Sequence, residues 1–157
     1  MPLLTQEAWI SDIVEDRRIS NCIAYNFDNV GDAIMDDALV ALRHYIDNVM
    51  LTRARALFPL CPDLTVENTG HFWYPRGSYM GWHTNLRTPG WRCYISIADV
   101  PDRSFFRYRV PGDGRVVTSW DRIWNMRLFY ISPAAPLWHA VYSDTNRFSL
   151  GYKIILN

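Results

Sequence analysis

Two histidines of this chain stand in apolar, strand-like surroundings and could meet at a metal ion. His83 lies in the run GWHTN, where the alternation of a strand would turn His83 and Asn85 to the same face. His139 lies in the run LWHAV, which also has the pattern of an apolar strand. Two neutral imidazoles are a common nucleus of a site for a divalent transition metal. On residue type alone, two unrelated core histidines would give the same pattern, and we interpret His44 and His71 as structural.

The last strand-like segment carries an arginine whose charge needs a partner. Alternation along this segment places Arg147 and Ser149 on one face. A guanidinium that points into an apolar barrel must find an anion, because an unpaired buried charge is very costly. The alternative is that Arg147 points outward in a surface hairpin. Fifteen of the sixteen basic residues are arginines and most of them follow residue 63, so a cleft in this half of the chain favours anions.

A long amphipathic helix is the clearest element that the pattern predicts. Its apolar residues recur at a spacing of three to four over residues 30–58, namely Val30, Ile34, Ala38, Leu42, Tyr45 and Val49. The prolines that follow cannot continue a helix, so we expect it to end near Leu57. Ahead of it, residues 5–16 favour a short helix and residues 22–27 a strand.

The chain after residue 63 changes to short apolar or alternating runs divided by Pro, Gly, Asp and Asn, which predict strands and turns. These runs cover residues 65–67, 71–74, 92–98, 105–110, 116–119, 127–131, 137–142 and 148–156. Seven or eight short strands favour a β-sandwich or barrel, so we expect an α+β, mainly β fold whose body is a jelly-roll-like double sheet. We expect one domain over residues 1–157, with N-terminal helices and a strand in 1–63, the jelly-roll core in 64–157, and one shared hydrophobic core.

Composition excludes several classes of protein. The chain has 157 residues, 49% of them apolar and 20% charged, and its net charge is zero, which excludes a disordered or fibrous protein. No apolar run approaches the roughly 18 residues of a membrane span, and we expect a cytoplasmic protein without a membrane partner. Three widely spaced cysteines are typical of reduced thiols. The absence of a Lys/Arg run argues against nucleic-acid binding.

Taken together, these segments resemble the iron(II)- and 2-oxoglutarate-dependent oxygenases, especially the small prolyl-hydroxylase-like branch. Residues 74–85, YPRGSYMGWHTN, are similar to that family's lead-in and its His-x-Asp motif. Residues 127–129, 137–141 and 147–150 then follow the family's closing order of a strand, the distal histidine and an Arg-x-Ser motif. The resemblance covers residues 67–156, and the helices predicted before them correspond to the family's covering helices.

The resemblance implies a double-stranded β-helix, the cupin-like jelly roll, with N-terminal covering helices, bound iron(II) and 2-oxoglutarate as co-substrate. The implied activity is that of a dioxygenase that hydroxylates a small molecule or a protein side chain, anionic substrates included. The implied metal ligands are His83, His139 and the residue at position 85. The implied co-substrate contacts are Arg147 and Ser149, which would bind the distal carboxylate, with Tyr94 and Tyr74 as further candidates. Arg92 and Arg127 could contact a bound carboxylate or face solvent.

Asn85 departs from the family pattern, which has an aspartate at this position. A neutral amide oxygen is a poorer donor to iron(II) than a carboxylate. Three interpretations stay open: Asn85 ligates through its side-chain oxygen, it leaves the position to water or a small anion, or the site has lost catalysis. In the last case the chain would be a catalytically silent metal- or 2-oxoglutarate-binding jelly-roll protein. A nearby acid, Asp99 or Asp144, could replace the carboxylate, and a jelly roll without any metal is the remaining alternative.

Overall fold

The computed structural model describes residues 23–25, 37–85 and 87–156 of the chain. Within these ranges the chain forms one helix, α2 (Asp37–Leu57), and nine strands. The strands are β1 (Ile23–Tyr25), β2 (Thr65–Tyr74), β3 (Ser78–His83), β4 (Gly90–Ala98), β5 (Ser104–Arg109), β6 (Val116–Trp120), β7 (Trp124–Ile131), β8 (His139–Ser143) and β9 (Arg147–Ile155). The predicted helix over residues 5–16 lies outside the described residues.

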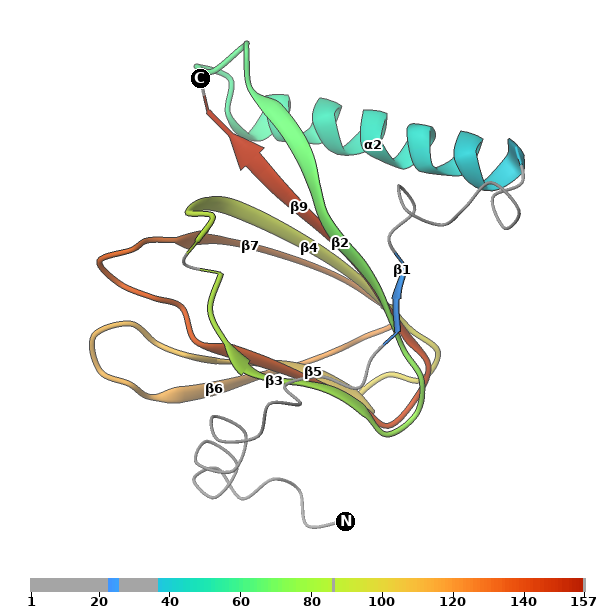
Figure 1. The fold of residues 1–157 in the computed structure, drawn as a ribbon, viewed down its shortest axis with the longest axis vertical. Helices are drawn as coiled ribbons and strands as arrows, with labels where there is room; N and C mark the ends of the chain where they lie inside the picture. Colours follow the sequence, from blue (N-terminus) through green and yellow to red (C-terminus); the bar gives the residue numbers. More distant parts are fainter. Residues whose placement is uncertain (1–22, 26–36, 86, 157) are drawn as a thin grey trace.

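The strands form two antiparallel sheets that face each other. The larger sheet has the order β1-β2-β9-β4-β7 and the smaller has the order β3-β8-β5-β6. Figure 1 shows α2 on the outer side of the larger sheet, and it shows the two sheets coming closest where the loops β2–β3, β4–β5 and β8–β9 lie. The prediction of a mainly β chain with a double sheet is confirmed at this level, with one helix in the described part.

The strand registers bring the chemically interesting residues toward one interior. His83 on β3 lies directly opposite His139 on β8. Arg147, at the start of β9, lies between Tyr74 on β2 and Ala98 on β4. Because successive side chains of a strand point to opposite faces, Arg147 faces the interior with Ser149, as the alternation predicts.

The helix ends at Leu57, as predicted from the prolines, but it packs through a different face from the predicted one. Tyr45 is 67% exposed and Val49 is 37% exposed, although both belong to the predicted apolar stripe. The buried stripe instead contains Met50 and Ala54, and the remaining start of the predicted helix precedes the described range. The helix has apolar residues on two neighbouring faces, and only the sheet decides which of them is covered.

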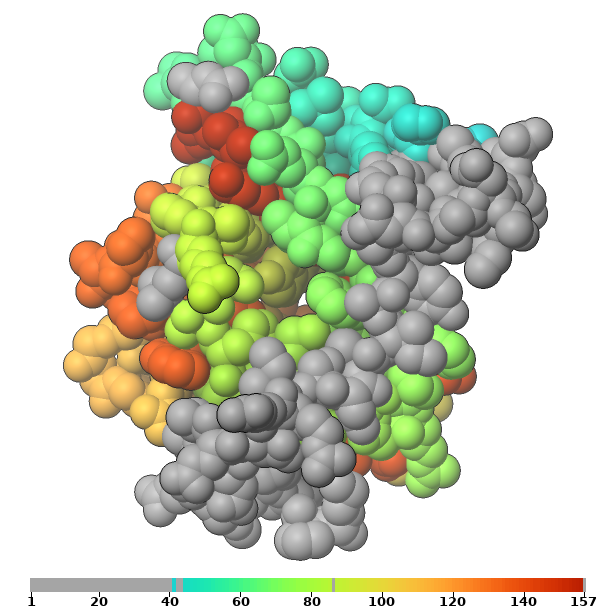
Figure 2. Space-filling model, viewed as in Figure 1, coloured from blue at the N-terminus to red at the C-terminus, as the bar shows by residue number. Residues whose placement is uncertain are grey.

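The apolar side chains form two separate clusters instead of the single core that we expected. One lies between α2 and the outer face of the larger sheet, and Figure 2 shows the helix lying against β2 and the C-terminal strand. Its buried members are Met50, Ala54, Leu64, Cys93, Tyr152 and Ile154. The other lies between the two sheets and is built on Tyr74, Phe106 and Val141. The interior between the sheets also contains buried polar side chains, among them His139, Arg147 and Ser149.

Several strands differ from the predicted runs. β7 begins at Trp124 and β8 at His139, where residues 127 and 137 were predicted, and β3 is not among the eight predicted runs. The runs predicted at residues 65–67 and 71–74 are one strand, β2, because a register shift between Asn68 and Gly70 lets pairing with β9 continue past the polar residues. Gly70 has a φ of 135°, which a residue with a side chain rarely adopts. The strand around His83 ends at His83 itself, so Asn85 lies beyond it. No helix in the described ranges combines the length and the apolarity needed to cross a membrane.

Replacing Met50 by alanine tests which face of α2 is packed. We expect Met50→Ala to lower the free energy of unfolding by about 2–5 kcal/mol, because it empties part of the buried cluster. The adjacent Val49→Ala is the matched control and should cost about 0.5 kcal/mol or less, since Val49 is exposed. Urea unfolding of the two variants measures both values, and equal losses would contradict the observed packing.

Candidate functional site

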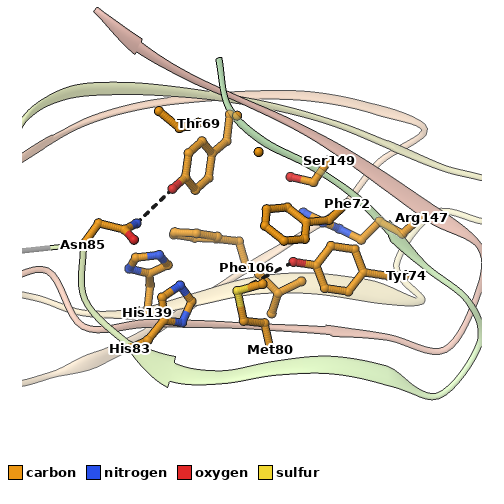
Figure 3. Close-up of a pocket in the computed structure, with 14 residues that line it drawn as sticks. Thr69, Phe72, Tyr74, Met80, His83, Asn85, Phe106, His139, Arg147 and Ser149 are labelled. Carbon is orange, nitrogen blue, oxygen red and sulfur yellow. Dashed lines mark hydrogen bonds between the residues drawn. The ribbon is translucent and has the colours of Figure 1, made fainter. Parts of the chain in front are cut away.

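A cavity of about 130 Å³ lies between the two sheets. It is lined by Thr69, Gly70, Phe72, Tyr74, Met80, His83, Asn85, Tyr94, Phe106, His139, Val141, Arg147, Ser149 and Gly151. The seven residues implied as metal ligands or co-substrate contacts are all in this set. Figure 3 shows the two histidine rings and Asn85 at one end, Arg147 and Ser149 at the other, and Phe72 and Phe106 between them.

The two histidines are held in one orientation by the strand backbone. Their ring centres are 4.1 Å apart. Nδ1 of His83 lies 2.7 Å from the carbonyl oxygen of Gly81, and Nδ1 of His139 lies 3.0 Å from that of Leu137. A carbonyl only accepts hydrogen bonds, so each Nδ1 carries the proton and each Nε2 carries the lone pair. This is the arrangement of histidines that bind a metal through Nε2.

Burial keeps both rings neutral. His139 is 1% exposed and lies against Phe106, Phe129 and Tyr94. Burial, together with the neighbouring His83, lowers the pKa of His139 to about 3. Burial also lowers the pKa of His83, although its bond to Gly81 opposes the shift. Nε2 of His139 is buried and has no hydrogen-bond partner among the described residues. Its lone pair is therefore available to a metal.

Asn85 completes this end of the cavity through Tyr94. Its amide nitrogen donates to the hydroxyl of Tyr94 at 3.0 Å, so the amide oxygen is the atom left to face the histidines (Figure 3). Burial raises the pKa of Tyr94, while Arg92 and Asn85 oppose the shift, and the hydroxyl therefore keeps its proton at neutral pH. Across the described part of the chain, no three residues of the types His, Cys, Asp and Glu come together as a metal site. The donor set is two imidazoles and one amide.

Arg147 meets an anion that the sequence did not predict. It is 1% exposed, and its Nε donates to Oδ2 of Asp121 at 2.7 Å. Its guanidinium carbon also lies 5.1 Å from the ring centre of Tyr74. Arg147 thus points into the interior and not outward in a surface hairpin. Its Nη1 is buried and has no hydrogen-bond partner among the described residues.

Asp121 is the centre of a buried ionic network. Its Oδ1 accepts from Nη1 of Arg127 at 2.7 Å and from the hydroxyl of Ser96 at 3.1 Å, and its Oδ2 also accepts from Ser104 at 2.7 Å. Burial alone would raise the pKa of Asp121, but Arg147, Ser104 and Arg127 outweigh it and hold the pKa below its usual value. Two guanidiniums against one carboxylate leave one positive charge. Arg147 lines the cavity, and its Nη1 has no hydrogen-bond partner among the described residues.

Four further residues considered from the sequence lie away from the cavity. Arg92 is buried but bonds to Thr88 and to the carbonyl of Trp91, and Arg127 belongs to the Asp121 network. Asp144 pairs with Arg76 and Arg103, while Asp99 accepts from Asn146. The suggestion that either acid replaces the missing carboxylate is therefore wrong. Each of the two has a partner at the surface and none at the histidines.

Asp121 is the functional residue that the sequence reading missed. It lies in the turn between β6 and β7, where an acid next to an arginine is ordinary. A buried Arg147 needs an anionic partner, and only six acidic residues follow residue 63, so the sequence narrows the choice of partner to a few acids. Naming Asp121 among them requires knowing that this turn lies beside the start of β9, and that is tertiary information.

Fold and site together define a two-sheet β protein with a buried pair of neutral histidines and a cationic cavity end. A comparison with models of known protein families gives no match, and a comparison with curated proteins finds no similar sequence. The function of the chain is therefore inferred from the geometry of the cavity and from the resemblance of the motifs.

The variant Asp121→Asn tests the ionic network. It should lower the free energy of unfolding by about 3–5 kcal/mol, because two buried guanidiniums lose their only carboxylate. Asp144→Asn removes the same charge from an exposed pair and should cost far less, since solvent screens it. Urea unfolding at neutral pH compares the two variants. Similar losses would mean that Asp121 adds nothing beyond a surface ion pair.

Proposed function

We propose that this chain is an iron(II)- and 2-oxoglutarate-dependent oxygenase that hydroxylates a small molecule or a protein side chain. The observation that carries the proposal is a pair of buried atoms without a hydrogen-bond partner among the described residues, Nε2 of His139 and Nη1 of Arg147, on two side chains that line one cavity. Nε2 of His139 can offer its lone pair to a metal, and Nη1 of Arg147 can donate a hydrogen bond to an anion. A co-substrate that chelates a metal at one end and carries a carboxylate at the other would satisfy both.

The strand order supports a jelly roll as the body of the protein. Counted from β2, successive strands change sheet except at the β5–β6 hairpin, which stays in the smaller sheet, and the two sheets have the orders β2-β9-β4-β7 and β3-β8-β5-β6. This interleaving is the order expected of a jelly roll with eight antiparallel strands in two sheets. In this arrangement β3 and β8 bring the histidines together, and β9 brings Arg147 to the same interior.

The residues at the histidine end fit a divalent transition metal. His83 and His139 would bind it through Nε2, and the amide oxygen of Asn85 would be the third protein donor. Iron(II) bound there supplies oxygen activation coupled to the oxidative decarboxylation of 2-oxoglutarate. Tyr94 orients the Asn85 amide, and the wall of Phe106, Phe129 and Tyr94 around His139 keeps water from the rings.

The residues at the other end fit a carboxylate. Arg147 offers Nη1 and Ser149 offers a hydroxyl on the same face of β9. Asp121 holds Nε of Arg147 and so fixes which edge of the guanidinium the anion meets. The ring of Tyr74 makes a cation–π contact with the guanidinium.

A second candidate function is a catalytically silent metal- or 2-oxoglutarate-binding protein. The neutral Asn85 and the absence of any third His, Cys, Asp or Glu at the histidines, among the residues described, favour it. The oxygenase binds both iron(II) and 2-oxoglutarate, and the silent protein binds at least one of them. Formation of succinate in the presence of oxygen and a substrate separates them, because only the oxygenase produces it.

Titration of the purified protein under anaerobic conditions tests the proposal directly. We expect one equivalent of iron(II) to bind, and added 2-oxoglutarate to give the weak visible absorption of an iron-bound 2-oxo acid. Arg147→Met should abolish 2-oxoglutarate binding and retain iron, and Ser149→Ala should weaken 2-oxoglutarate binding without touching Asp121. Lys153→Met on the same strand is the control. Unchanged 2-oxoglutarate affinity in folded Arg147→Met and Ser149→Ala proteins would remove β9 from the site.

The variant Asn85→Asp tests the third ligand. It restores a carboxylate beside two neutral imidazoles, so iron(II) should bind about tenfold or more tightly. Asn48→Asp adds the same charge on the exposed side of α2 and should leave the affinity unchanged. Calorimetric titration of iron(II) into both variants gives the comparison. Equal affinities in the two would show that Asn85 does not reach the metal.

A further inference from the structure

The outer face of β7 is apolar along its whole length and exposed. Trp124 is 67% exposed, Met126 61%, Leu128 38% and Tyr130 52%. These four residues alternate with inward-facing ones, which are more buried. Isolated exposed apolar residues are ordinary, but four in a row on one strand form a patch of the kind that marks an interaction site.

The position of α2 explains why this column is uncovered. The outer face of the larger sheet is apolar in successive rows that run from β9 through β4 to β7, such as Leu150, Ile95 and Met126. The helix cluster contains Leu150 and Ile95 from this row and does not extend to Met126. The helix covers the middle strands, and β7 lies beyond its reach.

The same strand is an open edge. β7 pairs with β4 on one side and, within the described chain, with no strand on the other. It is eight residues long and contains neither the proline nor the lysine that commonly protect edge strands. Its outward N–H and C=O groups therefore offer a template for another strand.

We propose that β7 of one molecule pairs antiparallel with β7 of a second copy across a twofold axis at Arg127. This register places Trp124 opposite Tyr130 of the other copy, and Met126 opposite its Leu128. The strand is thus complementary to itself, aromatic against aromatic and aliphatic against aliphatic, which favours a second copy over an unrelated strand. The contact uses the same surface on both molecules, so it closes as a dimer.

Charge and area are compatible with this dimer. Arg127 of each copy meets its equivalent at the axis, but it points inward and Asp121 neutralises it. The net charge of the chain is zero, so the copies do not repel each other at long range. Edge-to-edge pairing buries the backbone edges of the two strands and the flanks of the four exposed side chains, while their outward surfaces stay open, so the contact is that of a weak, concentration-dependent dimer. The interface lies outside the cavity and does not depend on the proposed activity.

Sedimentation of the full chain at micromolar concentrations tests the proposal. We expect a concentration-dependent dimer of the 18.4 kDa chain, and we expect Met126→Glu to weaken it about tenfold or more, because the charge would face Leu128 of the other copy. Leu60→Glu, at a residue that is 93% exposed on another part of the surface, is the matched control and should dimerise normally.

Hydrogen exchange provides the second measurement. Amides of residues 124–131 should exchange more slowly in the dimer than in the Met126→Glu protein, while those of α2 should not differ. A wild-type chain that stays monomeric overturns the proposal, whether the chain's own residues or a different protein cover β7. A dimer that survives Met126→Glu with unprotected β7 amides overturns it as well, because the contact then lies elsewhere.

Discussion

The carboxylate of Asp121 is the contact on which the arrangement of the interior depends. It follows β6 and binds Ser96 of β4, Ser104 of β5, Arg127 of β7 and Arg147 of β9, so one side chain joins both sheets. The sheets come closest at this end (Figure 1). Because the network is ionic and satisfied on nearly every side, its orientation is specified more narrowly than apolar packing would allow. One nitrogen of Arg147, Nη1, has no partner in this network, and Arg147 lines the cavity.

The cavity consequently has two chemically different ends at a fixed separation. At one end two imidazoles are kept neutral by burial and their lone pairs are exposed by backbone hydrogen bonds. At the other end a positive charge is fixed by its own carboxylate. Under the proposed function, a ligand would present an electron-pair donor for a metal at the first end and an anion at the second.

Much of this was predictable from the sequence, and the failures have physical causes. His83, His139, Arg147 and Ser149 reach one cavity, as strand alternation and the order of the motifs predict, and Asn85 reaches it from the loop after β3. The face of α2 and the partner of Arg147 depend on which elements lie side by side. Tyr45 and Val49 satisfy the helical period as well as Met50 does, and only the sheet distinguishes them. In the sequence, Asp121 is an ordinary turn residue. Its role as the partner of Arg147 follows only from the position of this turn beside β9.

The hydrogen bonds of the two histidines have a consequence for how such a site can change. In each case the acceptor is the carbonyl two residues earlier in the chain, Gly81 for His83 and Leu137 for His139. The hydrogen bond that orients each ring is therefore made by the main chain and does not involve a neighbouring side chain. A substitution at a neighbouring side chain leaves the acceptor of each Nδ1 in place, because that acceptor is a main-chain atom. The third donor and the walls of the cavity can therefore be exchanged by mutation while each imidazole keeps the same hydrogen bond to the backbone.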